Sequence, residues 1–291
     1  MAQSPREILR RIRGIKSTQQ ITKAMEMVAA VKVNKVRTQA ENARPYVDNM
    51  GTIMRALLSS GTTFKHPLLA VRDVKKMFLV VLTSDRGLCG TFNVNVINAA
   101  KEFLEQHADQ DVSIIAIGRK GHDALSKMGY TIEKAYDVPW GDAIALETAA
   151  INGYLLDAFS AERVDAAHLI YSHFTNVLQY VPTTIQYLPI PPLTEEQKKE
   201  LVKWSVDFIV EPSFEEVAQT LIPRYLETQL YHSIIESLAS EYAARMVAMR
   251  NASDNADEVI QELTLNYNKA RQASITRELL DIIGGVEALQ G

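Results

Sequence analysis

The residues that come closest to a chemical site form a turn over positions 84–90, which reads Ser-Asp-Arg-Gly-Leu-Cys-Gly. The turn follows an apolar run at 77–82 and precedes a stretch with helical spacing, so it joins a predicted strand to a predicted helix. A glycine-containing turn in this place can hold an anion against the first backbone N–H groups of the helix. It lacks the G-x-G-x-x-G and G-x-x-x-x-G-K-[ST] patterns of nucleotide sites. Three interpretations therefore stay open: a nucleotide site, a structural turn, and a loop that contacts a partner.

No other group of residues indicates catalysis or metal binding. Cys89 could act as a nucleophile at the start of a helix, but a small, partly buried core residue is the commoner role for such a cysteine. The six histidines are scattered and show no H-E-x-x-H spacing, and the sequence has no G-x-S-x-G motif. The sequence therefore predicts no catalytic residue, no metal ion and no cofactor.

The composition is that of a soluble folded protein, with 47% hydrophobic and 23% charged residues among 291. A net charge of −4 argues against a dedicated nucleic-acid-binding protein. The stretch from Arg6 to Arg44 is nevertheless basic, and a basic helix can meet RNA, an acidic protein surface or anionic lipid, or simply face solvent. One cysteine cannot form an internal disulfide, which favours a reducing compartment. No apolar run reaches the ~20 residues that span a bilayer, and we expect no signal peptide.

A long helix is predicted from Pro5 to about Ser60. Ser4 and Glu7 form a capping box around Pro5. Apolar residues then recur in steps of three and four, although polar residues interrupt the face. The apolar face comprises Ile8, Ile12, Ile15, Ile21, Met25, Val28, Val33, Val36, Ala40, Ala43, Val47, Met50, Met54 and Leu57, and the interrupting residues are Gln19, Thr22 and Glu26. Pro45 is expected to kink or loosen the helix.

A second long helix is predicted from Ser213 to about Ile283, where Gly284-Gly285 should end it. Ser213 and Glu216 form its capping box, and Pro223 should bend its first turns. Stepping alternately by three and four from Phe214 to Leu280 gives a sustained apolar seam that includes Tyr242, Met249, Val259, Leu263, Ala273 and Leu280. Such a helix of ~70 residues is about 100 Å long, so the first helix must cover it and its end should project alone. The apolar end at 275–283 is therefore a predicted partner surface.

The segment between the two helices reads as an α/β domain. Predicted strands at 77–82, 112–117 and 167–171 alternate with predicted helices at 93–106, 120–128 and 142–159, which indicates an open sheet of parallel strands. The alternating run at 181–189 contains two prolines and follows a turn near Asn176, so it is predicted to be an antiparallel edge strand. The predicted fold is a long antiparallel two-helix coiled coil, formed by the N- and C-terminal segments, with a Rossmann-like open α/β domain inserted. The domains are 1–60, 75–190 and 212–291.

Three stretches of this sequence resemble one family. They are Q-I-T-K-A-M-E-M-V-A-A at 20–30, T-S-D-R-G-L-C-G at 83–90, and A-A-R-M-V-A-M at 243–249, which continues to Y-N-K-A-R-Q-A-S-I-T-R-E-L at 267–279. Together they are similar to the gamma subunit of the F-type rotary ATP synthase, bacterial type, in the same order and over essentially the whole chain. The last stretch is the most specific. The sequence lacks the cysteine-bearing regulatory insert of chloroplast gamma subunits, and we expect no mitochondrial presequence.

The resemblance implies a rotor shaft that does no catalysis itself. Its partners would be three alpha and three beta subunits, the epsilon subunit and the ring of c subunits, without nucleic acid. Ion flow would turn the c ring and the shaft, and the shaft would change the nucleotide sites on the beta subunits. The complex would place the chain at the cytoplasmic face of the bacterial inner membrane, as a peripheral protein. The coupling ion, the size of the c ring and the regulation do not follow from this sequence.

The resemblance also implies contact residues. Met25 matches the position that meets the acidic lever loop of the beta subunit, and Arg245 lies in the run that makes polar contacts near it. Further matches are Arg271, Gln272 and Thr276 for the beta catch loop and Glu211 for the foot near the c ring and epsilon, while Ile275, Leu279 and Ile283 would form the tip within the alpha-beta collar. Met25 could instead pack in the seam, and Arg245 could bridge the two helices.

Two other classes of protein are compatible with parts of the sequence. A nucleotide-dependent enzyme could use the α/β domain with a helical arm, which predicts that the isolated chain binds or hydrolyses ATP. A static scaffold or RNA-binding coiled coil could use the basic first helix, which predicts salt-sensitive RNA binding.

Overall fold

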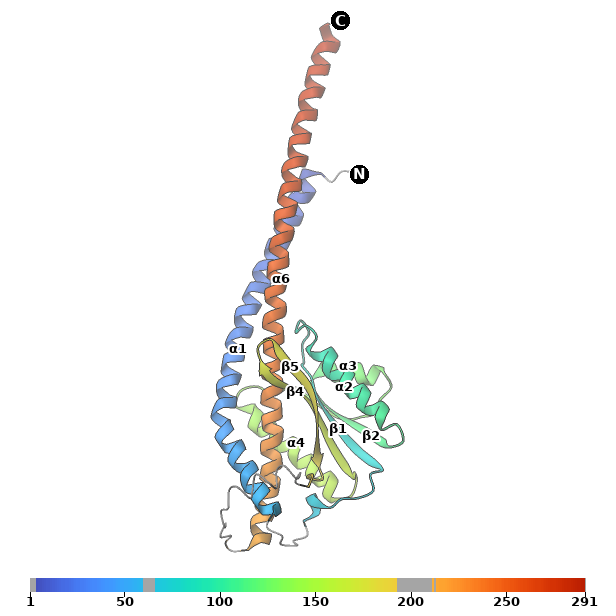
Figure 1. Cartoon of the computed structure of the whole chain (residues 1–291). Coiled ribbons are helices and arrows are strands. Elements are labelled where there is room, and N and C mark those ends of the chain that lie inside the picture. Colours follow the sequence, from blue (N-terminus) through green and yellow to red (C-terminus); the bar gives the residue numbers. More distant parts are fainter. Residues whose placement is uncertain (1–3, 60–65, 193–210, 212, 291) are drawn as a thin grey trace. The chain divides into compact units, whose positions relative to one another are not determined.

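The computed structural model describes residues 4–59, 66–192, 211 and 213–290. Its two long helices are α1 (Pro5–Ser59) and α6 (Phe214–Gln290), and the α/β domain lies between them in sequence (Figure 1). The chain divides into two compact units. The helical unit combines the residues up to 30 with those from 245 onward, and the α/β unit comprises residues 31–244.

The predicted capping box of Ser4 and Glu7 begins α1, and the predicted cap Ser213 begins α6. The Glu7 N–H donates to Ser4 Oγ at 3.4 Å, and the Ser4 N–H donates to Glu7 Oε2 at 3.1 Å. The Glu216 N–H donates to Ser213 Oγ at 3.3 Å. These bonds satisfy backbone donors that have no partner inside the helix.

The predicted end of the second helix at Gly284-Gly285 is wrong. The helix α6 continues through both glycines to Gln290, and Pro45 and Pro223 also lie inside their helices. A glycine costs only about 1 kcal/mol relative to alanine in a helix interior. The residues that follow the pair, V-E-A-L-Q, are mostly good helix formers, so the glycines alone do not stop the helix.

In the helical unit, α1 and α6 pack as an antiparallel pair, as predicted. Ile8 and Ile12 of α1 form a buried cluster with Ile260 and Leu263 of α6, whereas Thr22, later in α1, meets Ser253, earlier in α6, so the two helices run in opposite directions. Tyr267 and Ala270 pack at the edge of this cluster, opposite the start of α1. From 271 to 285 every residue whose side chain is described is exposed except Ser274, and Figure 1 shows this end of α6 extending past the start of α1.

The seam between the helices differs from the predicted one. Ile21 and Val28 are expected on the apolar face, but each is 58% exposed. On α6, Val259 is exposed and its neighbour Ile260 is buried instead. The positions reached from Ile8 by alternate steps of four and three are all buried or half-buried, although three of them are polar: Ile8, Ile12, Ile15, Gln19, Thr22, Glu26 and Ala29. The buried positions therefore keep the expected helical spacing but include polar residues, which a search for apolar residues alone does not find.

The α/β unit contains a five-stranded sheet with the strand order β3-β2-β1-β4-β5. Strands β1 to β4 are parallel, and β5 is antiparallel to β4 at one edge, as predicted. The strand β3 is absent from the prediction; it is a short edge strand in which Glu133 and Lys134 are exposed. The elements are the 3-10 helix η1 (Pro67–Leu69), β1 (Lys76–Leu82), α2 (Phe92–Gln106), β2 (Asp111–Ile117), α3 (Arg119–Lys127), β3 (Ile132–Tyr136), α4 (Ala143–Ser160), β4 (Ala166–Asn176) and β5 (Gln179–Leu188).

Helices cover both faces of this sheet, which explains why β1 is apolar along its whole length. Met77, Leu79 and Val81 join a cluster with α2, whereas Phe78 and Val80 join the larger core with α4 and α6. Figure 1 shows α2 and α3 on one side of the strands and α4 on the other. The sheet is therefore doubly wound, as expected for a Rossmann-like domain.

Within the α/β unit, α6 buries a row of residues that are not among the predicted seam positions. Every fourth residue from 218 to 234 is almost fully buried: Ala218, Ile222, Leu226, Leu230 and Ile234. These residues share a core with the sheet and with α4. Because the helix is covered by the α/β domain here, a single coiled-coil stripe underestimates its buried surface.

No helix among the described residues is both long and apolar enough to cross a membrane.

His168 makes the α/β unit sensitive to acid. It lies on β4 with its ring 4.9 Å from that of Phe103 and 6.2 Å from that of His107, and its Nδ1 has no hydrogen-bond partner among the described residues. Burial, with a smaller effect of His107, lowers the pKa of His168 from 6.5 to about 4. The unfolded chain takes up this proton near pH 6.5 and the folded chain only near pH 4, so folding stability is present above 6.5 and falls between these values.

We therefore expect a measurable pH effect in chemical denaturation. Between pH 7.5 and 5, the free energy of unfolding of the wild type should fall by about 1 kcal/mol more than that of His168→Leu, after allowance for the partial exposure of the ring. Parallel stability profiles for the two proteins would contradict this assignment.

Candidate partner-contact sites

A polar layer joins α1 and α6 in the middle of the helical unit. Gln19 Nε2 donates to the Ser253 carbonyl at 3.4 Å and to Asp257 Oδ1 at 3.3 Å. One turn along, the hydroxyls of Thr22 and Ser253 are 2.7 Å apart. These residues occupy the seam positions that apolar residues hold nearer the start of α1. Polar pairs inside a coiled coil disfavour shifted registers, because a shift would leave their hydrogen bonds unmade.

Met25 borders this layer on α1. Its side chain is half-buried, and the next residue, Glu26, is 9% exposed. Glu26 pairs with Lys23 at 2.9 Å on the same helix and with Arg250 of α6 at 3.4 Å. The position of Met25 therefore allows both roles named from the sequence: partial packing in the seam and an accessible thioether for a partner.

Arg245 is buried, with 8% of its surface exposed. Burying a guanidinium is costly unless it is paired or hydrogen-bonded, so its place in α6 is set by contacts within the chain. This burial favours a bridging role more than a broad contact surface. A polar contact with a partner at this position stays a prediction.

The other predicted contacts on α6 lie on open surface. Arg271, Gln272 and Thr276 are exposed. The three tip residues are also exposed, at 49% for Ile275, 54% for Leu279 and 59% for Ile283, and they recur every fourth residue. The tip residues therefore form one apolar stripe on a helix end that α1 does not cover.

Two further exposed sites complete the surface. Glu211 is exposed, just before the start of α6. On α1, Ile21, Met27 and Val28 are each 58% exposed, so the helix carries an outward apolar face near Met25. The sequence contains a signal for this face, since Ile21 and Val28 are seven residues apart, but the same spacing also fits a seam.

The turn between β1 and α2 is closed by its own side chains. Asn93 Oδ1 accepts from the Ser84 N–H at 3.0 Å, and Asn93 Nδ2 donates to Ser84 Oγ at 2.8 Å and to Cys89 Sγ at 3.2 Å. Cys89 is 2% exposed and packs with Phe92. This network supports the structural interpretation of the turn.

The neighbouring anion site of the α/β domain is filled from within. The first N–H groups of α3 are bound by the end of β1: Arg119 donates to Asp85 Oδ1 at 3.1 Å, Lys120 to the Ser84 carbonyl at 3.0 Å and Gly121 to Thr83 Oγ1 at 2.8 Å. A bound phosphate would need the same groups. The carboxylate of Asp85 therefore takes the place that an anionic ligand would occupy at this helix.

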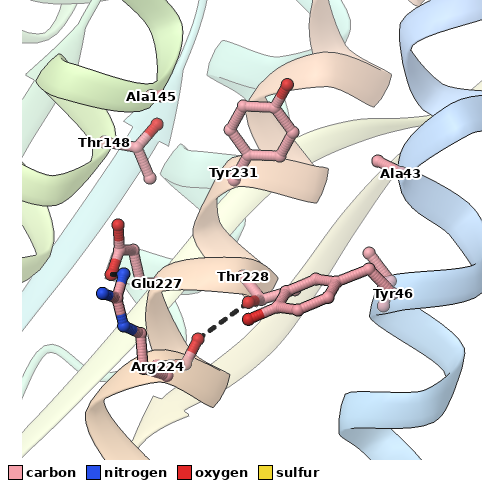
Figure 2. Close-up of a pocket in the computed structure, with 9 residues that line it drawn as sticks. Ala43, Tyr46, Ala145, Thr148, Arg224, Glu227, Thr228 and Tyr231 are labelled. Atoms are coloured by element: carbon pink, nitrogen blue, oxygen red, sulfur yellow. Dashed lines mark hydrogen bonds and ion pairs between the residues drawn. The ribbon is translucent and has the colours of Figure 1, made fainter.

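A shallow pocket of about 320 Å³ lies among α1, α4 and α6 in the α/β unit (Figure 2). Its threonines turn their hydroxyls to their own helices: Thr148 donates to the Ile144 carbonyl at 2.6 Å and Thr228 to the Arg224 carbonyl at 2.8 Å. Arg224 is paired with Glu227 at 3.2 Å. The lining therefore offers little free polar chemistry for a substrate. It consists of Ala43, Tyr46, Val47, Ala145, Thr148, Arg224, Glu227, Thr228 and Tyr231.

Comparison with known proteins gives matches over nearly the whole chain. A family model described as ATP synthase matches residues 4–289. The ATP synthase gamma chain of Pelotomaculum thermopropionicum is 43% identical over 289 residues, which is 99% of both chains. The gamma chain of Symbiobacterium thermophilum is 43% identical over 295 residues and covers both chains completely.

Solved structures give the same fold. A chain in the central stalk and c-ring structure of the Tetrahymena thermophila mitochondrial ATP synthase has a TM-score of 0.60 and 28% identity, covering 80% of this chain and 99% of that one. A chain of the Euglena gracilis mitochondrial ATP synthase has a TM-score of 0.69 and 21% identity, covering 98% of this chain and 94% of that one. The paired helices, the inserted α/β domain and the full-length identity lead to one assignment: the chain belongs to the family of ATP synthase gamma chains.

Proposed function

We propose that the chain is the central rotor shaft of an ATP synthase and a non-catalytic subunit of that complex. It couples ion-driven rotation of the c ring to conformational changes at the catalytic sites of the beta subunits. The observation that carries this proposal is the uncovered end of α6, where Ile275, Leu279 and Ile283 are about half exposed. An apolar stripe on a helix without an intramolecular partner indicates a protein surface that covers it. A collar of three alpha and three beta subunits would do so.

The surface of the helical unit suits a rotor because its sides differ. An apolar face with Ile21 and Val28 lies on α1, whereas α6 presents Arg271 and Gln272. Within a threefold collar, each beta subunit would meet a different side of this pair of helices. Only a difference in contact energy between two states can shift an equilibrium, so turning an uneven shaft changes which beta subunit is favoured in which state.

The proposed contacts follow the exposed positions. Arg271, Gln272 and Thr276 would meet the beta catch loop, and Met25, supported by the buried Arg245, would meet the acidic lever loop. Glu211 would lie at the foot, near the c ring and the epsilon subunit. We further propose that residues 1–60, 75–190 and 212–291 act as the three working domains.

The proposed location follows from these partners. The chain would lie at the cytoplasmic face of the bacterial inner membrane and would be attached there through the complex. Its part in ion transport would be indirect, because the c ring carries the ion.

Reconstitution tests the proposed function. Vesicles that contain the complete synthase should make ATP under an imposed ion gradient, and vesicles assembled without this chain should not. The isolated chain should neither bind nor hydrolyse ATP. Synthesis that persists without the chain, or turnover by the chain alone, would refute the proposal.

Charged substitutions at the tip test whether the exposed apolar stripe of α6 contacts the collar. In Ile275→Glu/Leu279→Glu/Ile283→Glu, three carboxylates replace the apolar stripe, and a collar that fits this stripe must then desolvate them. We expect roughly threefold lower ATP hydrolysis by the assembled complex, or a comparable loss of assembly. The matched control places three glutamates at Asn255, Asn266 and Asn268, which are already polar and exposed. A fully active tip variant would show that the stripe is dispensable.

A further inference from the structure

Trp140 links the α/β domain to both long helices. It lies in the loop between β3 and α4, and its ring makes an edge contact with Tyr242 of α6 at a centroid distance of 5.1 Å. Lys32 of α1 places its Nζ 4.6 Å from the Trp140 ring and 4.8 Å from the Tyr242 ring. The same Nζ donates to the Tyr242 hydroxyl at 3.2 Å. Lys32, Trp140 and Tyr242, here called the aromatic clamp, all belong to the α/β unit.

The loop that carries Trp140 is held on both sides. Before it, Asp137 accepts two hydrogen bonds from Arg119, at 3.0 and 3.2 Å, and the Val138 N–H donates to Asp85 Oδ2 at 3.2 Å. After it, Gly141 turns the chain with a φ of 64° and its carbonyl accepts from the Ile144 N–H. The loop is thus fastened to the ends of β1 and α3, and a force on the sheet reaches the Trp140 ring through short contacts.

The clamp differs in kind from the apolar contacts of α1 in this unit. Val36, Met54 and Leu57 join the apolar core, and apolar burial is non-directional. The Lys32 ammonium lies beside the two rings, 4.6 Å from the centroid of one and 4.8 Å from the centroid of the other, and such a contact has a preferred position. Its hydrogen bond to the Tyr242 hydroxyl adds a second directional restraint. Sliding or turning α1 against α6 would therefore strain the clamp before it disrupts the apolar packing.

We propose that the aromatic clamp transmits torque from the α/β domain to α1, and so acts as a positioning device for energy coupling. This inference rests on the proposed rotor function. When torque is applied, an intact clamp makes α1 rotate together with the α/β domain and α6. Without it, the helices still assemble, but part of each rotational step is lost as slip between them.

Coupling measurements on the complete synthase test this role. Lys32→Met removes the nearer ammonium and keeps most of the apolar stem, leaving Lys35 with its Nζ 5.8 Å from the Trp140 ring. Lys32→Arg restores a cation that binds aromatic faces well. We expect Lys32→Met to lower gradient-driven ATP synthesis roughly threefold relative to ATP hydrolysis, and Lys32→Arg to stay near the wild type. Val36→Ala is the matched control, because it weakens the packing of α1 one turn away and leaves the clamp intact.

Fluorescence provides a second readout on the full chain. The sequence has two tryptophans, Trp140 and Trp204, so Trp204→Phe leaves Trp140 as the sole reporter. Lys32→Met should shift the Trp140 emission, and Val36→Ala should not. An unshifted emission would overturn the clamp. Equal coupling losses in Lys32→Met and Val36→Ala, or no loss in Lys32→Met, would overturn its role in torque. A wild-type complex that fails to couple would instead refute the rotor function on which the inference rests.

Discussion

Replacing Met25 with lysine is expected to lower gradient-driven ATP synthesis about tenfold, while the complex still assembles. Met25 is half-buried at the edge of the polar layer, where Glu26 is already paired with Lys23 and Arg250. Because the Glu26 carboxylate is already paired, the ammonium of a lysine at position 25 would form an ion pair with a partner subunit instead. At the proposed lever-loop contact it would pair with acidic residues of beta, and one extra ion pair of ~1.4 kcal/mol in one rotational state slows departure from that state tenfold.

Three control variants separate this effect from simpler ones. Met25→Leu conserves volume and charge and should couple normally. Met25→Gln adds polarity without charge and should show a small loss. Gln20→Lys adds the same charge at an exposed position on a different side of α1 and should have little effect. If Met25→Lys synthesised ATP as well as Gln20→Lys, Met25 would not face an acidic partner loop.

Gly118→Ala is expected to destabilise the α/β unit by about 3 kcal/mol or more. Gly118 follows β2 with a φ of 101°, and an added Cβ would lie 2.4 Å from the Thr83 carbonyl oxygen and 2.8 Å from Thr83 Oγ1. Thr83 is itself fixed, because its hydroxyl donates to the Gly118 carbonyl at 3.2 Å and accepts from the Gly121 N–H. Neither residue can move without breaking the junction of β1, β2 and α3.

Gly129→Ala is the matched control for this substitution. Gly129 also has a positive φ, of 89°, but an added Cβ would have no atom of the described residues within 4 Å. It should therefore show the backbone cost alone, about 1 kcal/mol. Urea denaturation of both variants measures the difference. Equal losses would mean that the Thr83 contact relaxes and that the junction is softer than these distances indicate.

Much of the fold follows from local patterns in the sequence. The helix caps at Ser4 and Ser213, the apolar run of β1 and the proline-containing edge strand β5 each depend on few neighbours, and all are predicted correctly. The strand β3 is missed because its sequence, I-E-K-A-Y, carries two charged residues that suit an exposed sheet edge. An edge strand gives little apolar signal, and its place is set by pairing with β2.

Other features depend on tertiary contacts that a pattern cannot contain. The seam passes through Gln19 and Thr22 because Ser253 and Asp257 meet them across the helices. The buried face around Leu226 and Leu230 exists because the sheet and α4 cover α6 there. In each case the pattern gives the helical period correctly but not the buried side.

The candidate contacts divide in a similar way. The exposed tip of α6 can be predicted, since the first helix is too short to cover it. The burial of Arg245 cannot be predicted in this way. The contacts among Lys32, Trp140 and Tyr242 cannot be predicted either, because these residues lie more than a hundred positions apart in the sequence and share no motif. Partner identities come from the family resemblance and not from any spacing of residues.

The buried thiol has a practical consequence for observing this rotor at work. Cys89 is the only cysteine in the sequence, and its side chain is 2% exposed beneath the turn between β1 and α2. A maleimide dye would therefore react with a cysteine introduced at exposed Glu105 on α2 well before it reached the native one. The natural chain could then carry a single fluorophore for following rotation without first removing a native cysteine.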